Sequence, residues 1–178
     1  MLSEKVEEAL NEQLRWEFFS AYLYLGMASY FQALGLGGFA HWMKVQAMEE
    51  LTHASKFFSF LNERGGRARL GALEAPPWDW DSPLAAFQDA LKHEQNVTAR
   101  INSLVDLARE QHDHATEIFL QWFVTEQVEE ESSATEVIQK LKLAGEHPAS
   151  LYQLDRELGT RIFTMPSMGS ASTQEVRA

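Results

Sequence analysis

Residues 43–61 read MKVQAMEELTHASKFFSFL. Its apolar residues recur at spacings of three and four, which is typical of a helix with one face buried in a core. On that same face stand two ionisable residues, Glu50 and His53. Burying an unpaired charge is very costly, so a helix that carries these residues inward needs partners for them. The stretch therefore predicts a helix that contributes polar ligands to a protein interior.

Three other long segments have the same helical period. We predict long helices over about residues 3–33, 39–64, 82–111 and 114–144, each with one apolar stripe. Gly145 ends the last of them, and a fifth, short helix follows Pro148 with Leu151, Leu154 and Leu158 on one edge. Four long helices and a short fifth one indicate an all-α bundle.

The connections between these helices predict how they are ordered. Short joints at residues 35–38 and 112–114 make the first and second helices antiparallel, and likewise the third and fourth. The middle connection, residues 65–81, could reach roughly 50–55 Å when extended, enough to run along helices about 40–47 Å long. We therefore expect a crossover that makes the second and third helices parallel. Residues 1–163 form one domain in this interpretation, and the polar residues 164–178 a flexible C-terminal tail.

Composition and charge exclude several classes of protein. The net charge of -11 argues against a nucleic-acid groove, which needs a basic surface to meet phosphates. The absence of cysteine excludes thiolate zinc sites and iron–sulfur clusters in this chain, so a bound metal must use Glu, Asp, His or Gln. There is no secretory signal and no apolar run long enough to span a membrane, so we expect a cytoplasmic protein without a membrane partner.

Polar residues occupy the apolar stripe near the middle of all four long helices. They are Glu17, Glu50, His53, Glu94, Gln127 and Glu130. Four buried carboxylates repel one another unless cations or protons compensate them. Two divalent ions supply that compensation, and the Glu50/His53 spacing of three residues points both side chains the same way. Glu from two helices with Glu-x-x-His from the others is the pattern of di-metal bundles. Here one half has Glu50-x-x-His53, and the other has Gln127-x-x-Glu130.

These motifs resemble the bacterial non-haem ferritins along essentially the whole chain. The resemblance rests on Glu17, on EELTH at residues 49–53, on Glu94-Gln95 and on LQWFVTEQVEE at residues 120–130. It implies a ferritin-like four-helix bundle with a long crossover between helices two and three, plus a short fifth C-terminal helix. It also implies an iron-storage protein that acts as a ferroxidase, oxidising Fe(II) with O2 or peroxide inside a homo-oligomeric cage of 24 subunits.

The resemblance also implies roles for particular residues. One iron would lie among Glu17, Glu50 and His53; Glu50 would bridge to a second iron held by Glu94 and Glu130, with Gln127 beside it. A third iron position would use Glu49, Glu126, Glu129 and Glu130. Tyr24, two turns after Glu17, would hydrogen-bond near the centre and donate an electron, whereas we interpret Trp122 first as a packing residue. His93 is not part of the motif; we expect it at the surface, and a supporting role behind the ligands is the alternative.

The sequence differs from several related classes of protein, and these differences narrow the functions to be considered. A haem-binding bacterioferritin would have methionine where this chain has Leu51, and Glu-x-x-His in place of Gln127-x-x-Glu130, so we expect no haem. A di-iron oxidase or oxygenase acting on an organic substrate would use the same ligands and stays the alternative function. A rubrerythrin-like peroxidase would need cysteines, and a small DNA-protecting relative would place its iron ligands between subunits. A purely structural bundle would leave the buried carboxylates unexplained.

Overall fold

Five helices make up the fold. The computed structural model describes residues 2–145 and 147–163, and these contain no strand. The helices are α1 (Glu4–Ala33), α2 (Gly37–Glu63), α3 (Pro83–Glu110), α4 (His114–Ala144) and α5 (Pro148–Leu158). All five predicted helices are confirmed, whereas the predicted tail, 164–178, lies outside the described residues. In the part of the chain that is described, no helix is long and apolar enough to cross a membrane.

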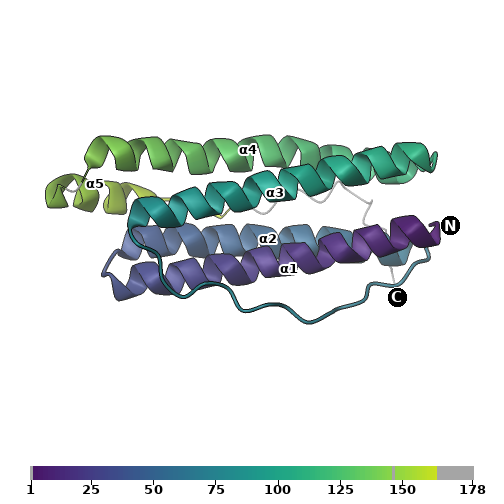
Figure 1. The fold of residues 1–178 in the computed structure, drawn as a ribbon, viewed down its shortest axis with the longest axis horizontal. Helices are drawn as coiled ribbons and strands as arrows, with labels where there is room; N and C mark the ends of the chain where they lie inside the picture. The colour runs from purple at the N-terminus through teal and green to yellow at the C-terminus, as the bar shows by residue number, and fades with distance from the viewer. Residues whose placement is uncertain (1, 146, 164–178) are drawn as a thin grey trace, which may run out of the picture.

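The long helices form two antiparallel pairs, α1 with α2 and α3 with α4 (Figure 1). Residues 64–82 return along the whole bundle before α3 begins, so α2 and α3 run in the same direction, as predicted. Asn11 ties this crossover to α1: its Nδ2 donates to the carbonyl of Arg67 at 3.0 Å, and its Oδ1 accepts from the Arg69 amide at 2.6 Å. Farther along, Pro76 lies against Gly26, which has no side chain to obstruct it.

Polar caps fix where three of the helices begin. Ser3 Oγ accepts from the Val6 amide before α1, and Ser82 Oγ accepts from the Ala85 amide before α3. Asp113 does the same for α4, where its Oδ1 accepts from the Thr116 amide at 3.2 Å. Each cap satisfies a backbone donor that the helix itself leaves unpaired. These three helices therefore begin at defined residues, which fixes how far along the bundle their buried polar residues lie.

Two apolar clusters fill the bundle, one at each end. The cluster on the α5 side contains, among others, Leu23, Met27, Phe31, Phe39, Met43, Phe87, Val137, Leu141 and Leu154. The cluster at the opposite end contains, among others, Leu10, Leu14, Phe57, Leu61, Val97, Ile101, Leu120 and Phe123. Along every long helix the two clusters are separated by buried polar residues. These are Gln13, Glu17, Ser20, Gln46, Glu50, His53, His93, Glu94, Gln127 and Glu130.

The start of α2 holds α5 in place. Asp155 Oδ1 accepts from the backbone amides of Gly38 and Phe39 at 2.7 and 3.0 Å, so a carboxylate from α5 caps α2. The backbones approach so closely that a Cβ at position 38 would lie 1.6 Å from the Asp155 carbonyl oxygen. Only glycine fits there, and this fixes the direction in which the chain leaves α5.

We expect Gly38→Ala to displace α5 and lower the melting temperature by several degrees, because the overlap is with backbone and overpacking costs about 1–3 kcal/mol. Gly37→Ala is the matched control, since a Cβ there meets nothing within 4 Å. Thermal unfolding followed by circular dichroism compares the two variants. Equal melting temperatures would show that the contact with Asp155 does not constrain the fold.

Candidate metal centre

Glu17 of α1 meets Glu50 and His53 of α2 in the middle of the bundle. Glu50 and His53 are three residues apart and so leave the same face of α2. His53 Nδ1 lies 3.4 Å from Glu50 Oε2 and 3.7 Å from Glu17 Oε2. All three side chains are buried, and one ligand atom from each lies within 4.8 Å of the others. Among the described residues, Glu17 Oε2 has no hydrogen-bond partner, so this oxygen is available to a cation.

Glu94 of α3 and Glu130 of α4 form the other half of the layer. Gln46 links the two halves, because its Nε2 donates to Glu50 Oε1 at 3.3 Å and to Glu130 Oε2 at 2.5 Å. Gln46 Oε1 is buried and has no hydrogen-bond partner within residues 2–145 and 147–163. The structure therefore places carboxylates from four different helices around one position in the bundle.

Both oxygens of Glu94 are held by neighbours. The Tyr24 hydroxyl donates to Oε1. Gln127 Nε2 donates to Oε2 and to the Glu94 carbonyl, each at 3.2 Å. Gln127 thus lies beside Glu94, with its amide nitrogen facing that carboxylate. Every residue that the sequence placed on the stripe, together with Tyr24, is brought to this layer.

The charge of this layer depends on its surroundings. Burial, reinforced by neighbouring carboxylates, raises the pKa of Glu50, Glu94 and Glu130 to about 8 each. Burial alone would lower the pKa of His53, but the carboxylates of Glu50 and Glu17 raise it well above its usual value. Without cations, the carboxyls therefore keep protons at neutral pH. A bound cation stabilises the carboxylate form and displaces those protons.

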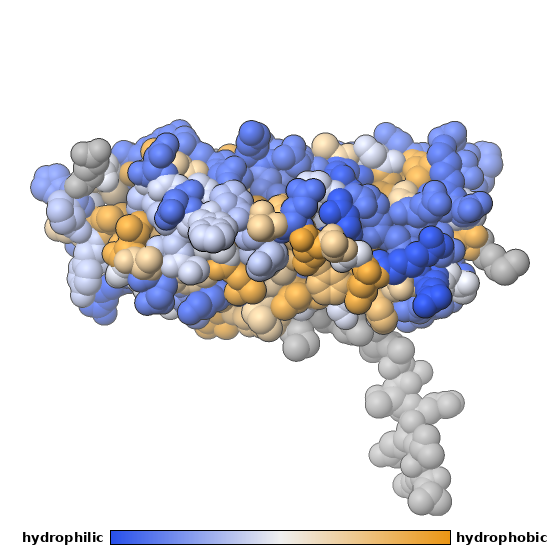
Figure 2. Space-filling view, turned by 60° about the horizontal axis from the view of Figure 1, so that its bottom comes forward, coloured by the Kyte–Doolittle hydropathy of each residue, from blue (hydrophilic) through white to orange (hydrophobic). Residues whose placement is uncertain are grey.

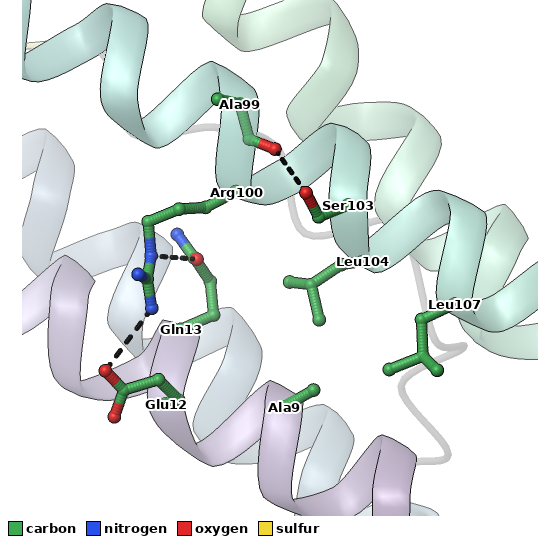
Figure 3. A pocket seen from close by; sticks show the side chains of 8 residues that line it. All are labelled: Ala9, Glu12, Gln13, Ala99, Arg100, Ser103, Leu104 and Leu107. Carbon is green, nitrogen blue, oxygen red and sulfur yellow. Dashed lines mark hydrogen bonds and ion pairs between the residues drawn. The ribbon is translucent and has the colours of Figure 1, made fainter.

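A chain of hydrogen bonds connects Glu17 to a surface groove. Gln13 Nε2 donates to Glu17 Oε1 at 2.8 Å, and Arg100 Nε donates to Gln13 Oε1 at 3.2 Å. Arg100 therefore fixes which end of the Gln13 amide faces the centre. Figure 3 shows Arg100 also reaching Glu12 at the polar end of the groove, which has a volume of about 370 Å³ between α1 and α3.

His93 lies buried behind Tyr24, so the favoured prediction of a surface position was wrong and the alternative, a supporting role, fits the structure. We expected His93 at the surface, but it is only 7% exposed and its Nε2 lies 2.7 Å from Ser20 Oγ. Its ring meets the Tyr24 ring edge-on, with centroids 6.3 Å apart. Burial lowers the pKa of His93 to about 4, so the imidazole is neutral at pH 7. The signal was present in the sequence, because His93 stands three residues after buried Ala90 and four before buried Val97.

A second acidic group adjoins the centre. A pocket of about 270 Å³ is lined by Glu49, His53, Glu126, Glu129, Glu130, Ser133 and Arg161. Ligand atoms of His53, Glu126 and Glu130 lie within 4.8 Å of one another, so two residues of the centre also face this pocket. Glu49 and Glu126 are partly buried and Glu129 is exposed. The structure thus brings together the four carboxylates that the resemblance assigned to a third position, while Arg161 was not foreseen.

Comparison with known proteins points to one family. Residues 7–144 match the family model described as Ferritin-like domain. The chain is 42% identical to the "Bacterial non-heme ferritin" of Bacteroides fragilis over 161 residues, covering 90% of this chain and all of that one. It is also 42% identical to the protein of that name in Staphylococcus aureus over 163 residues, covering 92% of this chain and 98% of the other.

Solved structures agree with this result. An engineered closed form of the Archaeoglobus fulgidus ferritin is 57% identical and superposes with a TM-score of 0.91, covering 92% of this chain and all of that one. The open-pore ferritin of the same archaeon is 56% identical with a TM-score of 0.90, covering 91% of this chain and all of that one. A humanized archaeal ferritin, 54% identical, has a TM-score of 0.92 and covers 93% and 100%.

The raised carboxyl pKa values predict that divalent cations bind in competition with protons. At pH 6 the three carboxyls are protonated; as the pH rises toward 8, protons leave and the affinity for cations increases. We expect Zn(II) affinity to rise at least roughly tenfold per unit between pH 6 and 7. Calorimetry in buffers of different ionisation enthalpy should count one or more protons released per Zn(II) at pH 7. Binding without proton release would contradict the assignment.

The Arg100–Gln13–Glu17 chain predicts an effect from outside the centre. Arg100→Met should free the Gln13 amide to rotate and weaken Zn(II) binding at Glu17, by roughly tenfold if it acts like other outer partners of metal ligands. Arg15→Met is the matched control, because Arg15 also pairs with Glu12, whereas the hydrogen bond to Gln13 Oε1 comes from Arg100. Titration of both variants with Zn(II) tests this. Equal affinities in the two would refute a role for Arg100.

Proposed function

Since the chain belongs to the ferritin family of iron-storage proteins, we propose that it oxidises Fe(II) at the buried centre and stores the ferric product. The observation that carries this proposal is the layer of carboxylates between two apolar clusters. Glu17, Glu50, Glu94 and Glu130 come from four helices and are each at most 7% exposed. Two Fe(II) ions neutralise four carboxylates, and His53 adds a neutral nitrogen ligand.

The geometry supports a particular division of ligands. One iron would bind Glu17, Glu50 and His53, whose ligand atoms already lie together. A second iron would bind Glu94 and Glu130, with Glu50 bridging the two ions. In support of this, Glu50 Oε2 faces His53 and its Oε1 faces Gln46, which also holds Glu130. Gln127 and Tyr24 would keep Glu94 oriented toward the second ion.

These ligands suit a cycle in which iron changes oxidation state. Hard carboxylate oxygens bind both Fe(II) and Fe(III), and flexible carboxylates can change their coordination. Two Fe(II) ions release one electron each, and O2 takes up these two electrons and two protons to form hydrogen peroxide. With a third Fe(II) in the adjoining acidic pocket, the Tyr24 hydroxyl beside Glu94 would supply a fourth electron, and O2 would then take up four electrons and four protons to form two molecules of water.

The adjoining acidic pocket would hold a third iron on its way to or from the centre. Glu49, Glu126, Glu129 and Glu130 are its proposed ligands. His53 and Glu130 border both the centre and this pocket. An ion that moves from the centre to the pocket, or back, would therefore stay within reach of their ligand atoms.

Storage requires a cavity, so we propose that the chain assembles into a homo-oligomeric cage. The resemblance to the bacterial non-haem ferritins implies 24 subunits. Large apolar side chains on α1 and the crossover support an interface: Tyr22 and Leu25 are 45% and 49% exposed, and Leu70 and Trp78 are 68% and 83% exposed. Figure 2 views the molecule with the crossover side turned toward the reader, and hydrophobic side chains gather on this face. Exposed apolar groups of this size are typical of association surfaces.

The acidic pocket beside the centre does not support the alternative function, a di-iron oxidase acting on an organic substrate. The pocket that borders His53 and Glu130 is lined largely by carboxylates, with Arg161 and Ser133, whereas an organic substrate of apolar character needs an apolar lining. Turnover of an added organic substrate with O2 would be the finding that favours the alternative.

Replacing Glu50 tests the ferroxidase proposal. Glu50→Gln should lower the initial rate of aerobic Fe(II) oxidation by at least roughly a hundredfold, because it removes the carboxylate shared by both ions. Glu136→Gln is the control, since Glu136 is an exposed acid that pairs with Lys140 on α4. Absorbance of the ferric product measures the rate. An initial rate within twofold of the unchanged protein would refute the assignment.

The mass of the assembly tests the storage proposal. Light scattering after gel filtration should give about 490 kDa, the mass of 24 chains of 20.3 kDa each. A monomer or dimer at micromolar concentration would contradict a cage, while leaving the metal centre within one chain intact.

A further inference from the structure

Arg161, three residues after the end of α5, reaches into the acidic pocket. One Nη donates to Glu49 Oε2 and the other to the Trp42 carbonyl at 3.5 Å. The guanidinium lies over the Trp42 ring, 4.2 Å from its centroid. Arg161 is an arginine among the carboxylates that line the pocket, and its guanidinium is positively charged at every physiological pH. It therefore occupies the position where a cation bound by Glu49 would otherwise lie.

The fold holds Arg161 there from the backbone side. Asp155 and Gly38 fix the end of α5 against α2, and Gly159 closes the helix with its amide donating to the Asp155 carbonyl. The chain then runs beside α2, where His41 Nε2 lies 2.8 Å from the Arg161 carbonyl oxygen. The backbone is thus anchored, while the long side chain of Arg161 is only partly buried, with 21% of its surface exposed. A side chain of this length can swing away without moving α5.

The pocket contains more negative charge than one guanidinium can balance. Glu126 and Glu129 also line it, and neither is bonded to Arg161. A divalent or trivalent cation entering the pocket would bind several carboxylates at once, whereas Arg161 holds only Glu49. The Arg161 guanidinium and the metal cation would compete for the Glu49 carboxylate, and the metal would displace the guanidinium when its concentration is high.

We propose that Arg161 is a built-in competitor for the cation in this pocket: it holds Glu49 when the pocket has no metal, gives way when iron binds, and weakens the binding enough for iron to move on. This inference rests on the proposed function, because it assumes that the pocket takes a third iron. The residue would set the affinity of the third position, while the two-iron centre keeps its own affinity.

The test is anaerobic calorimetric titration of the intact assembly with Fe(II). In Arg161→Gln, which removes the charge but keeps a polar side chain, the weakest class of sites should bind about three- to tenfold more tightly. The two tighter sites should be unchanged. Arg109→Gln is the matched control, because it removes an arginine that pairs with Glu117 elsewhere in the bundle. It should leave all three affinities unchanged.

A double-variant cycle separates competition from a structural role. In a Glu49→Gln background, Arg161→Gln should no longer tighten the third site, since the contested carboxylate is gone. A third site whose affinity is the same or lower in Arg161→Gln would overturn the inference while leaving the proposed function in place. A lower melting temperature with unchanged affinity would overturn it too, as a purely structural role. Only two irons per chain in every variant would overturn both this inference and the third position.

Discussion

The electrostatic cost of burying four carboxylates in the middle of a helical bundle is the constraint on which the structure depends. Glu17, Glu50, Glu94 and Glu130 lie between two apolar clusters that exclude water from both ends. In such surroundings, charges of one sign cannot coexist unless protons or cations balance them. The raised pKa values of three of these residues express that cost, and a pair of divalent cations would remove it.

Much of the surrounding structure holds these carboxylates in place. Gln13, fixed by Arg100, orients Glu17, while Gln46 spans the two halves of the centre. Tyr24, backed by the neutral ring of His93, orients Glu94. Such partners keep ligands near the geometry that a metal requires, so little reorganisation is needed when the metal binds. The same principle extends outward, because the docking of α5 places Arg161 beside Glu49.

The fold was largely predictable from the sequence because its signals are local. Helical periodicity, glycine stops and the cap at Ser82 place the helices, and the length of residues 65–81 requires a crossover. The stripe residues were predictable for the same reason, since a carboxylate such as Glu94 at an apolar position stands out. Their roles as iron ligands stay a prediction.

The supporting residues were harder to predict, because their roles depend on how side chains from different helices meet. Gln46 and Gln13 lie on their stripes, but which carboxylate each one binds follows from bundle geometry alone. His93 stands at the edge of its stripe, where burial depends on the neighbouring helix. Arg161 lies outside every helix and reaches the pocket only because Gly38 lets α5 pack closely on α2.

Anomalous diffraction can show whether the buried layer binds two cations. Crystals soaked in Fe(II) without oxygen and measured on either side of the iron edge would show where the metal lies. We expect two peaks inside each bundle, one beside Glu17 and His53, the other beside Glu94 and Glu130, with Glu50 between them. Peaks confined to surface acids, with none in the buried layer, would contradict a buried two-cation site.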